Sequence, residues 1–419
     1  MYDIVDQSGE RILQEIATGR TSPVEVLAAC MERIEALNPV LTAFVATRYL
    51  DARLEAERFL PSSSLPLHGL PVAVKDLNDV AGLPTSYGSP LFADNVPEAD
   101  DDVVAQVKTV GGIVLGKTNV PEHGFGATTT SPLFGSTGNP FDPGLSAGAS
   151  TGGGAVAVAT GMAPYATGSD FAGSLRTPAA FCGITGHRPS NGIVGTRRRS
   201  NAWSAFDVEG PMARCAADCK RLLAAMARRD PRDPLSMNPD ARLFAPPETV
   251  PLRSLRVAIS EDLGFAPMCS ANRAMFQDRL GRLSLLFRRV AEAAPDLVDA
   301  ERCFMTLRGV GFVADFGPMA EQFGERLGPL VLDELSRAQA LTCAQIGQAE
   351  KDHTRIYRAA VDFFESHDVL ITPAAAVPPF PHEEVHPRQI DGQPLEGYLT
   401  WEAIAWGITL TQCPATVDR

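Results

Sequence analysis

The alternation of strand-like and helix-like segments between residues 70 and 118 constrains the fold of this chain most strongly. "LPVAVKD" at 70–76 is a short apolar run that ends in two charges, and it predicts a buried strand. "DDVVAQVKTVGG" at 101–112 predicts a helix closed by glycine, and "IVLGKTN" at 113–119 predicts the next strand. A strand, helix and strand in succession favour parallel pairing, so we expect an α/β protein.

Other segments carry clear boundaries. "TSPVEVLAACMERIEALN" predicts a helix in which Ser22 is the N-cap, Pro23 the first helical residue and Glu25 completes a capping box. The expected apolar face of that helix consists of Val24, Leu27, Ala28, Met31 and Ile34. The remaining predictions are loops at 133–148 and 229–252, helices at 270–296 and 332–366, and a strand running into a loop in "DVLITPAAAVPPFP".

Composition excludes several function classes. The 419 residues carry a net charge of -13, so the surface is expected to repel the phosphates of nucleic acids. No apolar run approaches the roughly 18 residues of a membrane span, and the N-terminus lacks a signal-peptide pattern, so a cytoplasmic protein is expected. The eight cysteines include no C-x-x-C pair and are expected to be buried, reduced thiols. No metal or cofactor is expected.

Residues 111–118 read "GGIVLGKT" and match the phosphate-binding pattern G-x-x-x-x-G-K-T letter for letter. That pattern requires a strand before the first glycine and a helix from the lysine onward. Here Ile113, Val114 and Leu115 favour a strand themselves, and a predicted helix precedes them. We therefore interpret the first two glycines as the end of that helix and expect no nucleotide binding.

The stretch "GASTGGGAVAVA" at 148–159 places Gly152, Gly153 and Gly154 at the entrance of a predicted helix. Each glycine costs a helix about 1 kcal/mol relative to alanine. The backbone must therefore approach another group closely there, or the loop requires a positive φ. That group could be a phosphate, a packed strand or the carbonyl of a substrate.

A second glycine-bearing stretch is "GSDFAGSLRTPAAFCGITG" at 168–186. Ser174 follows small residues that leave its hydroxyl open to a substrate, and the N–H groups of residues 171–174 could converge as an oxyanion hole. A serine nucleophile needs a base, and none of the nearby histidines has a carboxylate in a suggestive position. Those histidines are His68, His123 and His187. On this stretch alone, a glycine-rich turn packed against a sheet is an equally good interpretation.

Lys75 offers a base of another kind. It ends a predicted buried strand, Ser150 begins a predicted helix, and Ser174 follows 24 residues later. Burial disfavours the ammonium form of lysine and lowers its pKa, so a buried Lys75 can accept a proton. Lys75 could take a proton from Ser150, which takes one from Ser174, and this relay needs no histidine.

With these residues assembled, the sequence resembles the amidase signature family. The family pattern G-G-S-S-G-G-S appears as "GASTGGG", and G-T-D-T-G-G-S-I-R-x-P-A-A-F-C-G appears as "GSDFAGSLRTPAAFCG". Further blocks similar to the family's are "GLPVAVKDLNDVAGLPTSYGSPLF", "GKTNVPEHGFG", "SPLFGSTGNPFDP" and "EGPMAR". The similarity runs from about residue 20 to 215 and recurs at "VLITPAAA" and "QCPATV".

The resemblance implies one α/β domain over residues 1–419, with a large mixed β-sheet flanked by helices on both faces and a core motif region at about 68–215. It implies that Ser174 is the nucleophile, that Lys75 is the base, and that Ser150 bridges them after a cis peptide bond from Ala149. The oxyanion and substrate-binding residues that it implies are Phe171, Ala172, Gly173, Gly124 and Thr151, with the N–H of Ser174.

The chain also departs from the family pattern. Phe171 stands in place of a small polar residue and is expected to narrow the site. The sequence stops at "CPATVDR", inside a late family block, so we expect an exposed sheet edge or apolar groove near residues 405–416. Other departures are Ala149 and Ala172 for glycines, Thr151 and Gly154 for serines, and His187 and Arg188 for an apolar residue and a lysine.

The implied function is hydrolysis of a carboxylic amide through an acyl-enzyme on Ser174, with release of ammonia or an amine. Two alternatives remain open: an A-type amidotransferase component that supplies ammonia for tRNA-dependent transamidation, and a catalytically inactive homologue. The expected partner is a small-molecule amide substrate, and a homodimer is left open. The amide itself is not specified, because the variable residues from roughly 195 to 400 that line such pockets carry no motif.

Overall fold

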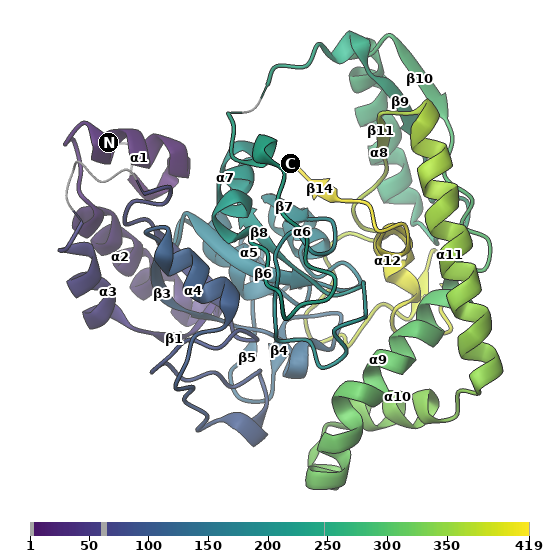
Figure 1. Ribbon diagram of the computed structural model, residues 1–419, viewed down its shortest axis with the longest axis horizontal. Coiled ribbons are helices and arrows are strands. Elements are labelled where there is room, and N and C mark those ends of the chain that lie inside the picture. Colours follow the sequence, from purple (N-terminus) through teal and green to yellow (C-terminus); the bar gives the residue numbers. More distant parts are fainter. Residues whose placement is uncertain (1–3, 60–64, 247, 419) are drawn as a thin grey trace.

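The computed structural model describes residues 4–59, 65–246 and 248–418. A mixed sheet with the strand order β1–β3–β2–β6–β8–β7–β14 forms its centre (Figure 1). β3, β2 and β6 run parallel, and the remaining neighbours pair antiparallel. In sheet order, the strands are β1 Phe44–Thr47, β3 Ile113–Thr118, β2 Pro71–Lys75, β6 Tyr165–Asp170, β8 Val208–Ala213, β7 Thr185–Arg188 and β14 Ala415–Val417.

The predicted strand, helix and strand between residues 70 and 118 are confirmed as β2, α4 (Asp102–Thr109) and β3. β2 pairs in parallel with β3 on one side and with β6 on the other. The carboxyl ends of parallel strands meet at one edge of a sheet, where ligands of α/β proteins bind. Lys75 at the end of β2 and Asp170 at the end of β6 therefore lie at the same edge.

Helices cover both faces of this sheet, as expected. Consecutive strand residues point to opposite faces. Tyr165 of β6 donates to Asp218 of α7 (3.2 Å), whereas Ala166 lies against Gly154 of α5. Besides α4, the helices are α1 Gly9–Ala17, α2 Pro23–Leu41, α3 Tyr49–Ala56, α5 Gly152–Ala159, α6 Arg176–Cys182, α7 Ala216–Met226, α8 Ser270–Leu283, α9 Ala300–Phe323, α10 Pro329–Gln339, α11 Cys343–Ser366 and α12 Ala403–Leu410.

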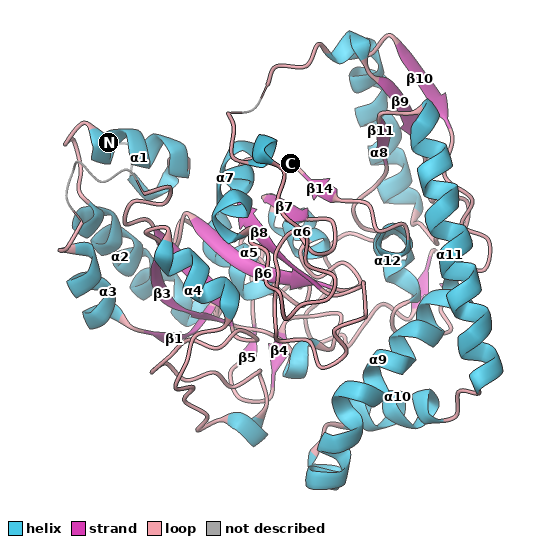
Figure 2. Ribbon diagram, in the orientation of Figure 1, coloured by secondary structure: helices cyan, strands magenta, loops and turns pink. Residues whose placement is uncertain are grey.

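A small parallel sheet lies apart from the main one, in the order β10–β9–β11, beside α8 and α11 (Figure 2). Its strands are β9 Arg256–Ile259, β10 Arg289–Glu292 and β11 Val369–Ile371, and two short hairpins are β4 Thr130–Ser131 with β5 Gly135–Ser136, and β12 Gln389–Ile390 with β13 Gln393–Pro394. The predicted helix at 270–296 is therefore wrong beyond Leu283. Pairing with β9 holds residues 289–292 in an extended conformation. The pattern of neighbouring residues gives no information about this pairing, because β9 lies about thirty residues earlier in the chain.

Two predicted helices agree with the structure only in part. α2 has the predicted capping box of Ser22 and Glu25, but Ala28 of the predicted apolar face is exposed, and Val26 and Cys30 are buried instead. The predicted helix at 332–366 is interrupted, because Thr342 caps a new helix, α11.

An exposed sheet edge or apolar groove was predicted near residues 405–416, where the structure has the helix α12 and the strand β14. α12 is buried almost throughout, so it presents no exposed groove. β14 lies at one edge of the main sheet and pairs only with β7 among the described strands. The expected sheet edge is therefore present at 415–417.

All eight cysteines are free, but not all are buried as expected. Cys343 is exposed, and Cys215 and Cys413 are partly exposed. No helix in the described part of the chain is long and apolar enough to span a membrane.

The phosphate-loop lookalike is an interior strand, as predicted. Residues 113–118 form β3, and Lys117 within it is fully buried. Its Nζ lies 2.9 Å from Asp76 Oδ1 and donates to the carbonyl of Asn78 (2.6 Å) and the hydroxyl of Thr85 (2.7 Å). The buried ammonium group thus donates two hydrogen bonds and pairs with a carboxylate inside the protein, so it does not face a phosphate cradle.

Candidate active site

The edge where β2 and β6 end brings Lys75 and Ser150 together. Lys75 is fully buried, and its Nζ lies 2.8 Å from Ser150 Oγ. The same nitrogen lies 3.0 Å from Ser169 Oγ and 3.4 Å from the Ser169 carbonyl oxygen. The first step of the predicted relay, a contact between lysine and bridging serine, thus has hydrogen-bond geometry.

Burial lowers the pKa of Lys75 to about 7, because the site cannot solvate the ammonium ion. The negative charges of Glu209 and Asp207 oppose this shift. A lysine with a pKa near neutrality spends much of its time as an amine at physiological pH, and an amine can act as a base.

The glycines at the entrance of α5 are explained by close packing. Gly152, Gly153 and Gly154 are not among the glycines with positive φ. A Cβ on Gly153 would lie 2.5 Å from the backbone nitrogen of Asn119, and one on Gly152 would collide with the Thr129 hydroxyl. The start of α5 is therefore pressed against neighbouring loops. The peptide bond between Ala149 and Ser150, just before these glycines, is cis.

Asp170 holds the loop that carries Ser174. Its carboxylate accepts the N–H groups of Gly173 (3.1 Å) and Leu175 (3.2 Å) and pairs with Arg176 (2.8 Å). Burial alone favours the protonated carboxyl, but Arg176 and then Arg188 hold the pKa of Asp170 well below its usual range. The carboxylate therefore stays charged and fixes the loop.

The N–H groups of residues 171–174 differ in availability. Gly173 donates to Asp170, so its N–H is already used. Among the described residues, the N–H groups of Phe171, Ala172 and Ser174 have no hydrogen-bond acceptor. Three of the four expected donors are thus available to a ligand.

Ser174 and Ser150 line the same cavity of about 410 Å³. Within the described ranges, no hydrogen bond joins their hydroxyl groups. Such contacts are often long in structures without substrate and tighten when substrate binds. The Thr151 N–H donates to the Ser174 carbonyl (3.2 Å), which ties the two serine loops together.

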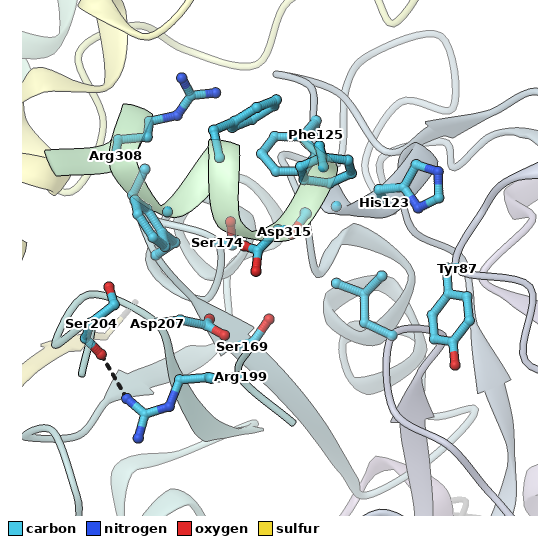
Figure 3. A pocket seen from close by; sticks show the side chains of 18 of the residues that line it. Tyr87, His123, Phe125, Ser169, Ser174, Arg199, Ser204, Asp207, Arg308 and Asp315 are labelled. Carbon is cyan, nitrogen blue, oxygen red and sulfur yellow. Dashed lines mark hydrogen bonds between the residues drawn. The ribbon is translucent and has the colours of Figure 1, made fainter. Parts of the chain in front are cut away.

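The cavity has an aromatic part and a polar part (Figure 3). Phe125 contributes to the aromatic part, together with Phe312 and Phe316 from α9. The polar part comes from the loop at 198–207 and from Asp315 and Glu402. Of the predicted binding residues, Gly124, Phe171 and Ala172 line the cavity, whereas Thr151 is fully buried and lies outside the lining.

The histidines make poor candidates for the base. His68 and His187 do not line the cavity, and His187 contacts Thr416 (2.8 Å) on β14. His123 lines the cavity beside Tyr87 (Figure 3), but burial lowers its pKa to about 4. No cluster of three or more His, Cys, Asp or Glu in the described part of the chain could hold a metal ion.

Sequence reasoning missed several groups at this site. Ser169 and Asp170 lie inside the quoted block "GSDFAGS", so their position beside Ser174 was a usable signal. Glu402 lines the cavity with only 6% of its surface exposed, and burial followed by the charge of Asp170 raises its pKa to about 8. Nothing local marks Glu402 or α9, because they reach the site only through tertiary folding.

Known proteins resemble this chain in sequence and in fold. The chain is 32% identical over 404 residues to an acylamidase from Rhodococcus erythropolis, covering 94% of this chain and 84% of the relative. It is 42% identical over 248 residues to the A-type component of the glutamyl-tRNA(Gln) amidotransferase from Thermus thermophilus, which covers 59% of this chain and 52% of the relative. The fold matches that of a bacterial aryl acylamidase with a TM-score of 0.88 at 23% identity, over 98% of this chain and 89% of the other.

The family model named Amidase matches residues 25–417, nearly the whole chain. The matched region contains both serine loops and the strand that ends in Lys75. The resemblance noted in the sequence is thereby confirmed, and this chain belongs to the amidase signature family of hydrolases.

Proposed function

We propose that this chain hydrolyses carboxylic amides through an acyl-enzyme on Ser174, with Lys75 as the base and Ser150 as the bridge. The observation that carries the proposal is the buried Lys75 amine, 2.8 Å from Ser150 Oγ in a cavity that Ser174 also lines. The full-length similarity to an acylamidase supports the same reaction class.

In the proposed mechanism, Lys75 accepts the Ser150 proton while Ser150 accepts the Ser174 proton. Ser174 Oγ then attacks the amide carbon. The resulting oxyanion receives hydrogen bonds from the N–H groups of Phe171, Ala172 and Ser174. Each such donor typically contributes about 3 kcal/mol to transition-state stabilisation.

Collapse of the tetrahedral intermediate breaks the C–N bond, and the leaving nitrogen takes a proton back through Ser150 from Lys75. Water then attacks the acyl-enzyme with Lys75 again as the base. The carboxylic acid leaves, and Ser174 recovers its proton.

A fluorophosphonate probe tests the nucleophile without knowledge of the substrate. We expect covalent labelling of the wild-type chain at Ser174 and none in Ser174→Ala. Turnover of a panel of aliphatic amides, aryl amides and ureas then identifies the substrate. Absence of both labelling and turnover would favour an inactive homologue.

The A-type amidotransferase component is the second candidate, because the chain is 42% identical to one such protein over 248 residues. That match covers only 52% of the relative's length. Ammonia release from glutamine that requires the other amidotransferase components would favour this candidate over a free-standing amidase.

A further inference from the structure

Beside Lys75 lies a group of charged side chains that the catalytic relay does not use. Glu209 on β8 is directly paired with Ser169 on β6, and Ser169 Oγ lies 3.0 Å from Lys75 Nζ. Side chains that are directly opposite across paired strands share one face of the sheet. Glu209 is therefore a buried carboxyl group on the same face as the base, with 1% of its surface exposed.

Glu209 is bound by Arg198, which lines the substrate cavity. Arg198 Nε lies 3.1 Å from Glu209 Oε1, and Arg198 Nη2 lies 3.0 Å from Asp207 Oδ2. One guanidinium thus bridges two carboxylates. The remaining contact of Glu209 Oε1 is with the Asn78 side-chain amide (3.1 Å), which also lies 3.3 Å from Asp101 Oδ2.

Two further carboxylates near Lys75 have cationic partners of their own. Asp170 pairs with Arg176 and Arg188, and Asp76 pairs with Lys117. In the described part of the chain, Arg198 is the only cation that pairs with Glu209 or Asp207. Asp101 and Asp315 also feel the charge of Arg198, and neither has an ion-pair partner there. Without Arg198, two negative charges would remain beside the base.

We propose that Arg198 is a positioning residue for the base: by pairing with Glu209 and Asp207, it cancels the negative charge that would otherwise keep Lys75 protonated. This inference rests on the proposed role of Lys75. It links the wall of the substrate cavity to the proton affinity of the base, because the same side chain belongs to both.

The directions of the pKa shifts agree with this linkage. Burial lowers the pKa of Lys75, and Glu209 and then Asp207 are the largest opposing influences, while Arg198 lowers it further. Burial raises the pKa of Glu209, and Arg198 counteracts that effect. Removing Arg198 therefore favours a proton on the Lys75–Glu209 pair.

The test is the pH dependence of kcat/KM and of fluorophosphonate inactivation for a set of variants. For Arg198→Gln we expect the acid limb to move to higher pH by about one unit, so that the rate at pH 7 falls roughly fivefold more than the rate at pH 9. For Glu209→Gln we expect the limb to move to lower pH. In the variant that combines Arg198→Gln with Glu209→Gln, the acid limb should return toward its wild-type position. Arg198→Lys keeps the positive charge and should leave the acid limb near its wild-type position.

Arg197→Gln is the matched control. Arg197 is the preceding residue, and it pairs with Asp102 outside the cavity lining. This variant should keep the wild-type acid limb.

Failure of the proposed base and failure of the proposed role of Arg198 give different results. If Lys75→Ala keeps a near-normal rate, the base itself is misassigned. If Lys75→Ala is inactive while Arg198→Gln lowers the rate by the same factor at every pH, Arg198 serves only structure or binding, and the inference is overturned. The inactivation assay separates the base from substrate binding, because it requires no amide.

Discussion

Substituting alanine for Gly153 tests the packing that positions Ser150. The added Cβ would lie 2.5 Å from Asn119 N and 2.7 Å from the carbonyl oxygens of Ala43 and Asn119. Ordinary contact begins at 3.4 Å, so the helix start or the opposing backbone must move by about 0.9 Å. All three contacts are main-chain atoms, which have no rotamer to change.

The cost of such overpacking is about 1–3 kcal/mol, and rigid backbone neighbours place Gly153→Ala at the upper end. Alanine regains at most about 1 kcal/mol of helix propensity, which leaves a net loss near 2 kcal/mol in the free energy of unfolding. For a chain of 419 residues we expect Tm to fall by roughly 2 °C.

Thermal unfolding followed by circular dichroism measures this change, and fluorophosphonate labelling measures its effect on the site. Gly281→Ala in α8 is the matched control, because no described heavy atom beyond its chain neighbours and the local helix backbone lies within 4 Å of the added carbon. That variant should be stabilised by about 0.5–1 kcal/mol. If Gly153→Ala is as stable and as reactive as Gly281→Ala, close approach does not explain these glycines.

Three further outcomes are expected. Ser174→Ala should abolish both turnover and covalent labelling, whereas Ser150→Ala should leave slow turnover, because water can replace the bridging hydroxyl. The kcat/KM of the wild type should rise with pH through about 7, where Lys75 loses its proton, and a limb near 4 instead would point to His123. The wild type should show no saturable ATP binding that Lys117→Ala could remove. Lys117→Ala should instead lower the free energy of unfolding by about 3–5 kcal/mol, because Asp76 would stay buried without its partner.

Local sequence was sufficient for the elements that depend on near neighbours. The capping box of α2, the buried strand that ends in Lys75 and the strand at 113–118 each follow from a few consecutive residues. The cis peptide before Ser150 was expected from the family resemblance and not from any local pattern. The physical reason is that caps, apolar runs and tight loops satisfy their backbone groups within one or two turns of chain.

The rest depended on residues that are distant in sequence. β10 is a strand because β9 pairs with it. Thr151 lies outside the cavity lining because its side chain packs against β6, where its hydroxyl donates to the Ser169 carbonyl. Two aromatic residues of the cavity, Phe312 and Phe316, come from α9, more than one hundred residues after Ser174. The proton affinity of Lys75 depends on Glu209 and Arg198, which reach it across β6. A cavity and its electrostatic field are sums over such distant contacts, so tertiary structure alone decided them.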